Sequence, residues 1–272
     1  MATKTRKATS RTYQFERDGK PCELGRVTKI MEKVTGDAKG GMSYWGSQNA
    51  IQWAFEEFSE VVSDSYGPEW EDWYTAYKSS PFDNNKTMRS RGKEGTAAHK
   101  LFEQLLLGEA VIVEAPAIDD VIHVCVGNDV PFTPVSYDLA VVRAYQDIFQ
   151  HLAPGEIQSE RKVTWFEPGH PGDCPDDICT HGYAGTTDFV VPSLSVGGDL
   201  KTHKGDARFT DFLQNAFYAK AIKQEDGTAF DHFLILLARE DGTYDDAHGF
   251  VPEEAVDACY ALWRVMEGGW LQ

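Results

Sequence analysis

The stretch YAGTTDFVVPSLSVGGDLK, residues 183–201, contains two apolar runs separated by PSLS. Each run has the length of a buried strand, and the four-residue break predicts an antiparallel hairpin. Residues two apart in a strand project from the same face, so we expect Asp199 and Lys201 side by side, with Leu200 turned into the core. The hairpin also brings Asp188, in the first strand, next to Asp199 at one end of a sheet.

Two neighbouring carboxylates inside a protein are costly unless a cation pairs with them. Asp188 and Asp199 therefore predict a site for Mg²⁺ or Mn²⁺, in which Lys201 orients or deprotonates a water molecule. The alternative is an ordinary ion pair between Asp199 and Lys201 at the end of a strand. Motifs elsewhere in the chain favour the metal site.

From residue 138 onward, apolar periodicity and turn signals predict elements in the order α-β-β-β-α-β-β-α. This order predicts an α/β fold with a mixed central sheet flanked by helices. Apolar spacing also predicts helices in the first hundred residues, while the proline-broken residues 109–135 are ambiguous. We expect a flexible basic arm (1–24), a mainly helical lobe (25–137) and an α/β core (138–272). The predicted helices are 47–64, 68–80, 95–108, 137–152, 209–224 and one from Pro252, and the predicted strands are 158–166, 183–191, 195–201, 233–238 and 244–250.

The chain has 272 residues, is 42% apolar and carries a formal net charge of −17. This charge disfavours a protein that coats nucleic acid, but it leaves room for a local basic channel, because Arg89, Arg91 and Lys93 cluster within residues 86–100. The cysteines are few and odd in number, and no apolar run resembles a secretory signal or a membrane span. We therefore expect a cytoplasmic protein with free thiols.

Three ordered motifs give the chain a family resemblance. The pattern G-x-x-D at 185–188, followed by D-x-K at 199–201, resembles the PD-(D/E)XK nuclease superfamily. G-T-x-x-H at 95–99 and Q-x-x-x-Y at 214–218 are similar to two further signatures of the RecB-like exonucleases, a group with phage-encoded, CRISPR-associated and mitochondrial members. The resemblance covers most of residues 25–250. It implies a restriction-endonuclease-like core carrying an N-terminal helical lobe.

The resemblance also assigns roles to residues. It implies that His99, Asp188, Asp199 and the Leu200 carbonyl bind the metal, while Asp188, Asp199 and Lys201 are catalytic. A lone histidine on a helix is otherwise usually a core residue, and Glu103, one turn after His99, is either a support for His99 or a solvated side chain. The residues implied to line the active site or contact DNA are Gln214, Tyr218, Glu160, Arg89, Arg91 and Lys93.

The cysteines bear on two other kinds of metal centre. Some relatives hold an iron–sulfur cluster through one early and three late cysteines, but the late part of this chain offers only Cys259, so we expect no such cluster. The loop HPGDCPDDICTHG places His170, Cys174, Cys179 and His181 close in sequence. These four could bind a structural Zn²⁺, although their spacing and the loop composition favour an ordinary insertion.

The expected function is a metal-dependent DNA exonuclease that acts on single-stranded DNA or DNA ends, in phage or bacterial recombination, repair or replication. Its expected partners are DNA and recombination or replication proteins, with no membrane. The alternatives are a nuclease-fold DNA-binding accessory protein, a structure-specific endonuclease, or a metal hydrolase with another substrate, which the acidic charge favours.

Overall fold

The computed structural model describes residues 12–17, 20–35, 84–114, 122–153, 155–168, 181–203, 205–230 and 232–268. Within these ranges the chain alternates strands and helices, as an α/β protein does. The elements are β1 (Thr12–Arg17), β2 (Lys20–Arg26), α1 (Val27–Thr35), α4 (Asn84–Leu106), β3 (Ala110–Glu114), β4 (Ile122–Val126), α5 (Ser136–Ala144) with a π-helical turn (Tyr145–Phe149), β5 (Gln158–Phe166), β6 (Gly182–Val191), a 3-10 turn (Pro192–Leu194), β7 (Val196–Lys201), α6 (Phe209–Asp226), β8 (His232–Ala238), β9 (Tyr244–Gly249) and α7 (Glu253–Gly268).

The central sheet is mixed, with β1-β2-β6-β7-β8-β9 as its main path and β5 paired to β6. The strand pairs β1–β2, β5–β6, β6–β7 and β8–β9 are antiparallel, whereas β2–β6 and β7–β8 are parallel. The parallel β7–β8 pair needs a crossover connection, and α6 supplies it. A separate two-stranded sheet is formed by β3 and β4. The expected mixed sheet flanked by helices is confirmed.

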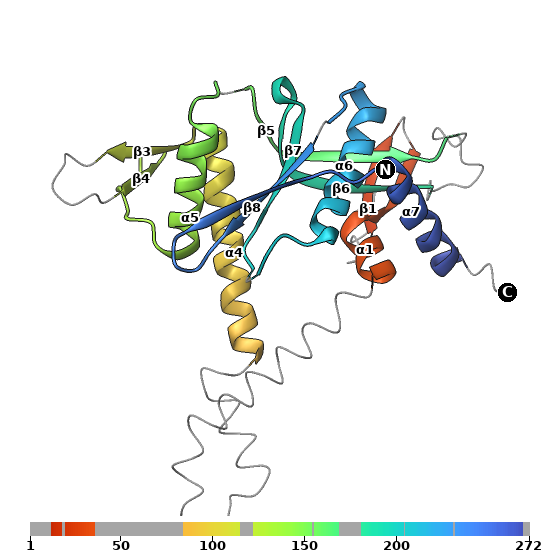
Figure 1. Ribbon diagram of the computed structural model, residues 1–272, viewed down its shortest axis with the longest axis horizontal. Coiled ribbons are helices and arrows are strands. Elements are labelled where there is room, and N and C mark those ends of the chain that lie inside the picture. The colour runs from red at the N-terminus through yellow and green to blue at the C-terminus, as the bar shows by residue number, and fades with distance from the viewer. Residues whose placement is uncertain are drawn as a thin grey trace, which may run out of the picture. The chain divides into compact units, whose positions relative to one another are not determined.

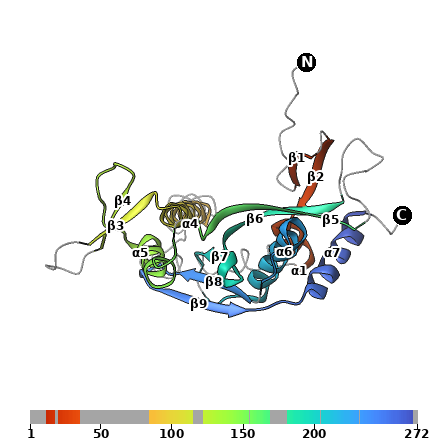
Figure 2. The same cartoon turned by 90° about the horizontal axis from the view of Figure 1, so that it is seen from above.

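Apolar side chains lie on both faces of the sheet, which explains the unbroken apolar run HFLILLA in β8. Leu234 and Leu236 join one buried cluster with α4 and α5, while Phe233 joins another with α1, α6 and α7. Figures 1 and 2 show the same division, with α4 and α5 gathered at one end of the sheet and α1, α6 and α7 at the other. β7 lies between these two groups of helices.

The glycine at 198 permits a close approach in the middle of the sheet. A Cβ atom there would lie 2.7 Å from Phe189 Cε2, as well as against the backbone of Leu234. Phe189 is fully buried and makes edge-to-face contacts with Phe102 and Phe149, at centroid distances of 5.8 and 5.1 Å. Gly198 therefore lets an aromatic ring pack directly behind the strand that carries Asp199.

The predicted arm at 1–24 is wrong for its described residues, which form β1 and β2. Polar neighbours conceal an alternating apolar pattern in this segment: Tyr13 pairs with Leu24, and Leu24 is fully buried. Residues 109–135, ambiguous from sequence, contain the β3–β4 hairpin, whose Val124 packs against the α4 and α5 cluster.

The chain divides into two compact units, residues 1–35 with 98–272, and residues 36–97. The expected division at 24/25 and 137/138 differs from this one, because α1 and the end of α4 pack with the core of the sheet. The helices predicted at 47–64 and 68–80 lie outside the described residues. The remaining predicted helices and strands match α4 to α7 and β5 to β9 to within a few residues, except that α4 begins earlier, at Asn84. Over the described part of the chain, no helix is both long and apolar enough to cross a membrane.

Candidate metal centre

A fork between β6 and β7 forms the candidate site. The two strands pair over only three positions, ending at Phe189 and Gly198, and β7 then continues beside β8. Asp188 and Asp199 are the next residues on each strand, so they occupy the mouth of the fork, as the hairpin predicted. One carboxylate oxygen of Asp188, Oδ2, accepts a hydrogen bond of 2.7 Å from the Leu200 amide, which partly replaces the missing strand pairing.

Two further ligand candidates approach Asp188 from other elements. His99, from α4, places Nδ1 3.3 Å from Asp188 Oδ2. Glu160, from β5, lies at the register position across from Asp188. Ligand atoms of His99, Glu160 and Asp188 all lie within 4.8 Å of one another, a spacing that one metal ion can bridge. The mixed nitrogen and oxygen donors suit a divalent ion such as Mn²⁺.

The backbone at Glu160 departs from regular strand geometry. Its φ of +48° is left-handed, which is uncommon for a residue other than glycine, asparagine or aspartate. The ladder between β5 and β6 skips Glu160 and Asp188, while the pairs on either side, Ser159–Phe189 and Arg161–Thr187, are intact. This local distortion, which costs roughly 1–3 kcal/mol, accompanies a Glu160 carboxylate that lies close to His99 and Asp188.

The two aspartates differ in their affinity for protons. Burial opposes ionisation of Asp188, but hydrogen bonding to His99 and the Leu200 amide, together with the charge of His99, lowers its pKa. Burial and the negative charge of Asp188 raise the pKa of Asp199 to about 7, despite an ion pair between Asp199 and Lys201. The two neighbouring carboxylates therefore repel each other, and a bound cation would relieve this repulsion.

The charged partners of the aspartates are held in their cationic forms. Burial lowers the pKa of His99, but the hydrogen bond and charge of Asp188 outweigh it, so the net shift is upward. Burial also opposes the charge on Lys201, and the neighbouring Asp199 outweighs it in the same way. A metal bound by His99 would have to displace this proton, because only neutral imidazole is a ligand. Burial, followed by the charges of Asp188 and Glu103, raises the pKa of Glu160.

The Q-x-x-x-Y motif fixes the position of Lys201. The Lys201 ammonium group donates to Gln214 Oε1 at 3.2 Å, and Gln214 Nε2 donates to the Tyr218 hydroxyl at 2.7 Å. The two bonds use both ends of the amide and so define its orientation. Tyr218 is buried, and burial raises its pKa well above the ordinary value. A Cβ atom on Gly185 would come closer than 3.0 Å to the Tyr218 ring, so the glycine of G-x-x-D makes room for this tyrosine.

The structure thus brings together His99, Glu160, Asp188, Asp199, Lys201, Gln214 and Tyr218. The metal-binding role of the Leu200 carbonyl stays a prediction, as do the catalytic assignments. Lys93 is exposed on α4 in the unit of residues 36–97, while the side chains of Arg89 and Arg91 lie outside the described part. Of the proposed zinc ligands, only His181 is described, and its Nδ1 lies 3.2 Å from Glu167 Oε2.

The family resemblance places Glu160 only among the residues that line the active site or contact DNA, not among the metal ligands. Its direct place in the cluster depends on the strand register and on a left-handed backbone, and glutamate gives no local signal for either. The motif spacing located His99 and Asp188 better, because each lies in a pattern that the resemblance had singled out.

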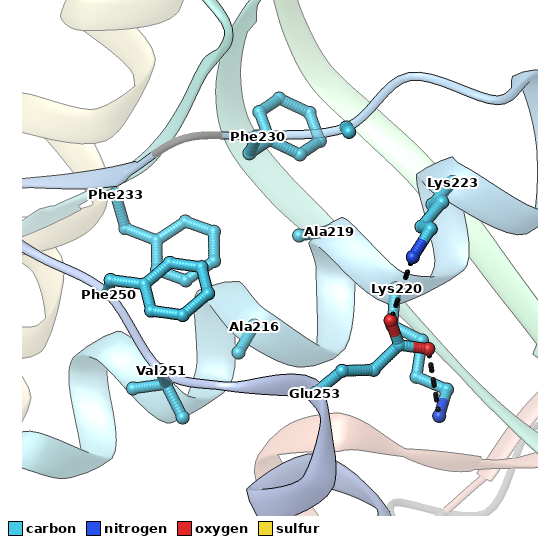
Figure 3. Close-up of a pocket in the computed structure, with 10 residues that line it drawn as sticks. Ala216, Ala219, Lys220, Lys223, Phe230, Phe233, Phe250, Val251 and Glu253 are labelled. Carbon is cyan, nitrogen blue, oxygen red and sulfur yellow. Dashed lines mark hydrogen bonds and ion pairs between the residues drawn. The ribbon is translucent and has the colours of Figure 1, made fainter.

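A pocket separate from this cluster lies between α6 and the segments that flank β8 and β9. Figure 3 shows the Phe233 and Phe250 rings stacked along one side, with a centroid distance of 6.2 Å. At the opposite side Glu253 accepts from Lys223 at 2.9 Å and pairs with Lys220 at 3.3 Å. Because both lysines are already neutralised, the pocket combines an apolar wall with a closed ion-pair network and adds no candidate catalytic group.

No protein-family model matches the sequence, and no curated protein matches it. Among solved structures, the chain is similar to one described as "Crystal structure of SSO0001", at 9% sequence identity and a TM-score of 0.30. The similarity covers 48% of this chain and 66% of that one, which is under two thirds of its length. At this level it carries no argument about function.

Proposed function

We propose that this chain is a metal-dependent deoxyribonuclease of the PD-(D/E)XK superfamily, in the RecB-like exonuclease group, acting on single-stranded DNA or DNA ends. The observation that carries the proposal is the fork between β6 and β7. It places Asp188 and Asp199 at its mouth, with Lys201 ion-paired to Asp199 and His99 3.3 Å from Asp188. These four residues come from two of the three sequence motifs, and the third motif supplies Gln214, which contacts Lys201.

The proposed chemistry is hydrolysis of a phosphodiester. His99, Asp188 and Asp199 would hold the divalent ion, with Glu160 as a further ligand, and the ion would offset the negative charge of the scissile phosphate. Lys201, anchored by Gln214, would orient the attacking water and stabilise charge as it develops. The water oxygen forms a new bond to phosphorus while the bond to the leaving sugar oxygen breaks, and a proton from the water ends on that leaving oxygen.

The test is cleavage of end-labelled single-stranded DNA, duplex DNA and RNA by the full chain, with Mg²⁺ or Mn²⁺ titrated into each. We expect cleavage of DNA only, loss of all but a few per cent of activity in Asp188→Ala, and full activity in the control Glu254→Ala, an exposed acid on α7. DNA binding without cleavage in either metal would instead support an accessory protein. Activity on none of the three substrates and no binding would refute the assignment to nucleic acid.

His99 gives a second readout of the same site. Mn²⁺ accepts nitrogen ligands more readily than Mg²⁺, so the intact site should work better with Mn²⁺. His99→Ala should weaken Mn²⁺ affinity and remove most of this preference, which isothermal titration and activity measurements would check. An unchanged metal preference would exclude His99 as a ligand.

A further inference from the structure

The central strand β6 reaches the surface at two positions. Thr186 and Asp188 are partly exposed, whereas the other residues of the strand are buried. The two lie on alternate positions, about 6.7 Å apart along the strand. Thr186 also occupies the register position across the open fork from Lys201. A ligand that contacts Asp188 can therefore extend along β6 over Thr186.

Basic and hydroxyl groups surround Thr186. Lys162 is exposed on β5 and pairs directly with Thr186, which brings their Cβ atoms to about 5 Å. The Tyr13 hydroxyl, from β1, lies 3.3 Å from Thr186 Oγ1. Arg26, at the end of β2, pairs with Ala184, which lies two residues before Thr186 on β6. Residues from three strands other than β6 thus converge beside the metal cluster.

Arg26 is held in place by an aromatic ring and a backbone carbonyl. Its guanidinium lies over the Tyr13 ring at 4.8 Å from the centroid, and its Nε donates to the Thr12 carbonyl at 3.4 Å. Among the described residues, neither Arg26 nor Lys162 forms an ion pair with a carboxylate. Lys29, Lys220, Lys223 and Arg161, by contrast, are each paired with at least one acid. In a chain of net charge −17, two unneutralised cations beside an acidic cluster favour an anionic ligand.

We propose that Lys162 and Arg26 bind the backbone phosphate adjacent to the one that is cleaved, so that the substrate strand runs along β6 from Asp188 toward Ala184. The inference rests on the proposed nuclease function and gives the direction of the strand across the sheet. Thr186 and Tyr13 donate hydrogen bonds to the same phosphate. The spacing of about 6.7 Å between Thr186 and Asp188 is comparable to the step between neighbouring phosphates in an extended strand. Because phosphate contacts carry no sequence information, this path accepts any base sequence.

The test is equilibrium binding of fluorescent single-stranded oligonucleotides to the full chain, in an Asp199→Asn background that prevents cleavage. We expect Lys162→Gln to weaken binding about three- to tenfold and to reduce the slope of log affinity against log salt by about 0.7. Arg26→Gln should weaken binding to a similar extent. Because Arg26 contacts Tyr13 and Thr12 of β1, this change could also destabilise that strand, and the exposed Lys162→Gln then remains the informative variant. The matched controls are Lys29→Gln on α1 and Lys223→Gln on α6. Both lysines are exposed and paired with an acid, Lys29 with Glu32 and Lys223 with Glu253.

A second arm locates the phosphate. Oligonucleotides carry one uncharged methylphosphonate linkage, moved stepwise from each end. One position should weaken binding to the Asp199→Asn protein and have a smaller effect once Lys162→Gln is added, because one of the two partner charges is then already absent. If the wild-type chain cleaves DNA but Lys162→Gln and Arg26→Gln match the controls in affinity and salt slope, the path along β6 is wrong and the nuclease proposal stands. If the wild-type chain neither cleaves nor binds DNA, both proposals fail.

Discussion

Gly185→Ala tests how the fold positions Lys201, the lysine proposed to be catalytic. The added Cβ would come closer than 3.0 Å to Tyr218 Cε1 and lie 3.2 Å from Cδ1 and Cζ. Because Tyr218 is buried, its ring has little freedom to yield, and overpacking of this kind costs roughly 1–3 kcal/mol. At roughly 2–4 °C per kcal/mol for a chain of this size, Tm should fall by about 3–10 °C. Displacement of the tyrosine also weakens its 2.7 Å bond with Gln214 and so loosens Lys201.

The expected catalytic effect of Gly185→Ala is a fall in kcat of about 10- to 100-fold with DNA affinity unchanged, since groups that orient a catalytic residue act on this scale. Thermal denaturation and single-turnover cleavage measure the two effects. The control is Gly92→Ala on α4, where nothing lies within 4 Å of the new Cβ, and which should stabilise the helix by about 0.5–1 kcal/mol. Adding Tyr218→Leu to Gly185→Ala should recover stability but not rate. A Gly185→Ala protein with unchanged Tm and kcat would refute the reasoning.

Three further predictions concern the charges of the site. The pKa of Asp199 is raised to about 7 from an ordinary value of 3.8, so the protonated carboxyl group stabilises the fold fully below about pH 4, and this contribution is lost as pH rises to about 7. In metal-free protein, the stability of Asp199→Asn relative to wild type should therefore increase by a few kcal/mol between about pH 4 and 7 in urea denaturation, and a difference that does not change with pH would contradict the shift. Glu160→Gln should weaken Mn²⁺ binding about 10- to 100-fold by calorimetry, whereas Glu103→Gln should not, and equal effects would exclude Glu160 as a ligand. Lys201→Ala should lower kcat about 100- to 1,000-fold with KM little changed, whereas the control Lys220→Ala should leave both kcat and KM unchanged. If Lys201→Ala changed KM alone, Lys201 would instead bind a phosphate of the substrate.

Local signals in the sequence predicted the core from β5 to α7 well. The apolar run of β8, the Asp241–Gly242 turn before β9 and the start of α7 after Pro252 each mark an element within a few residues. Gly242 has a φ of +81°, and Asp241 accepts bonds from Thr243, so this turn is determined by its own residues. Such elements need no information from distant parts of the chain.

The features that escaped prediction depend on distant partners. The β1–β2 hairpin joins the central sheet because Gly25 pairs in parallel with Tyr183, far away in sequence, and nothing near Gly25 indicates that pairing. The position of Lys162 beside Thr186 likewise follows from the β5–β6 register, which is the same on both sides of Glu160. The family motifs supplied His99, Asp188 and Lys201, but the groups that surround them had to come from three-dimensional packing.

The parallel pairing of β7 with β8 also determines when the site is completed during synthesis. The ribosome releases β6 and β7 before α6 and β8, so the nascent chain first holds Asp188 and Asp199 on strands that share only three paired positions. Gln214 then arrives on α6, and β8 closes the open edge of β7 last. An unfinished chain therefore carries both aspartates without an anchored Lys201, so the candidate site is complete only after α6 and β8 have left the ribosome.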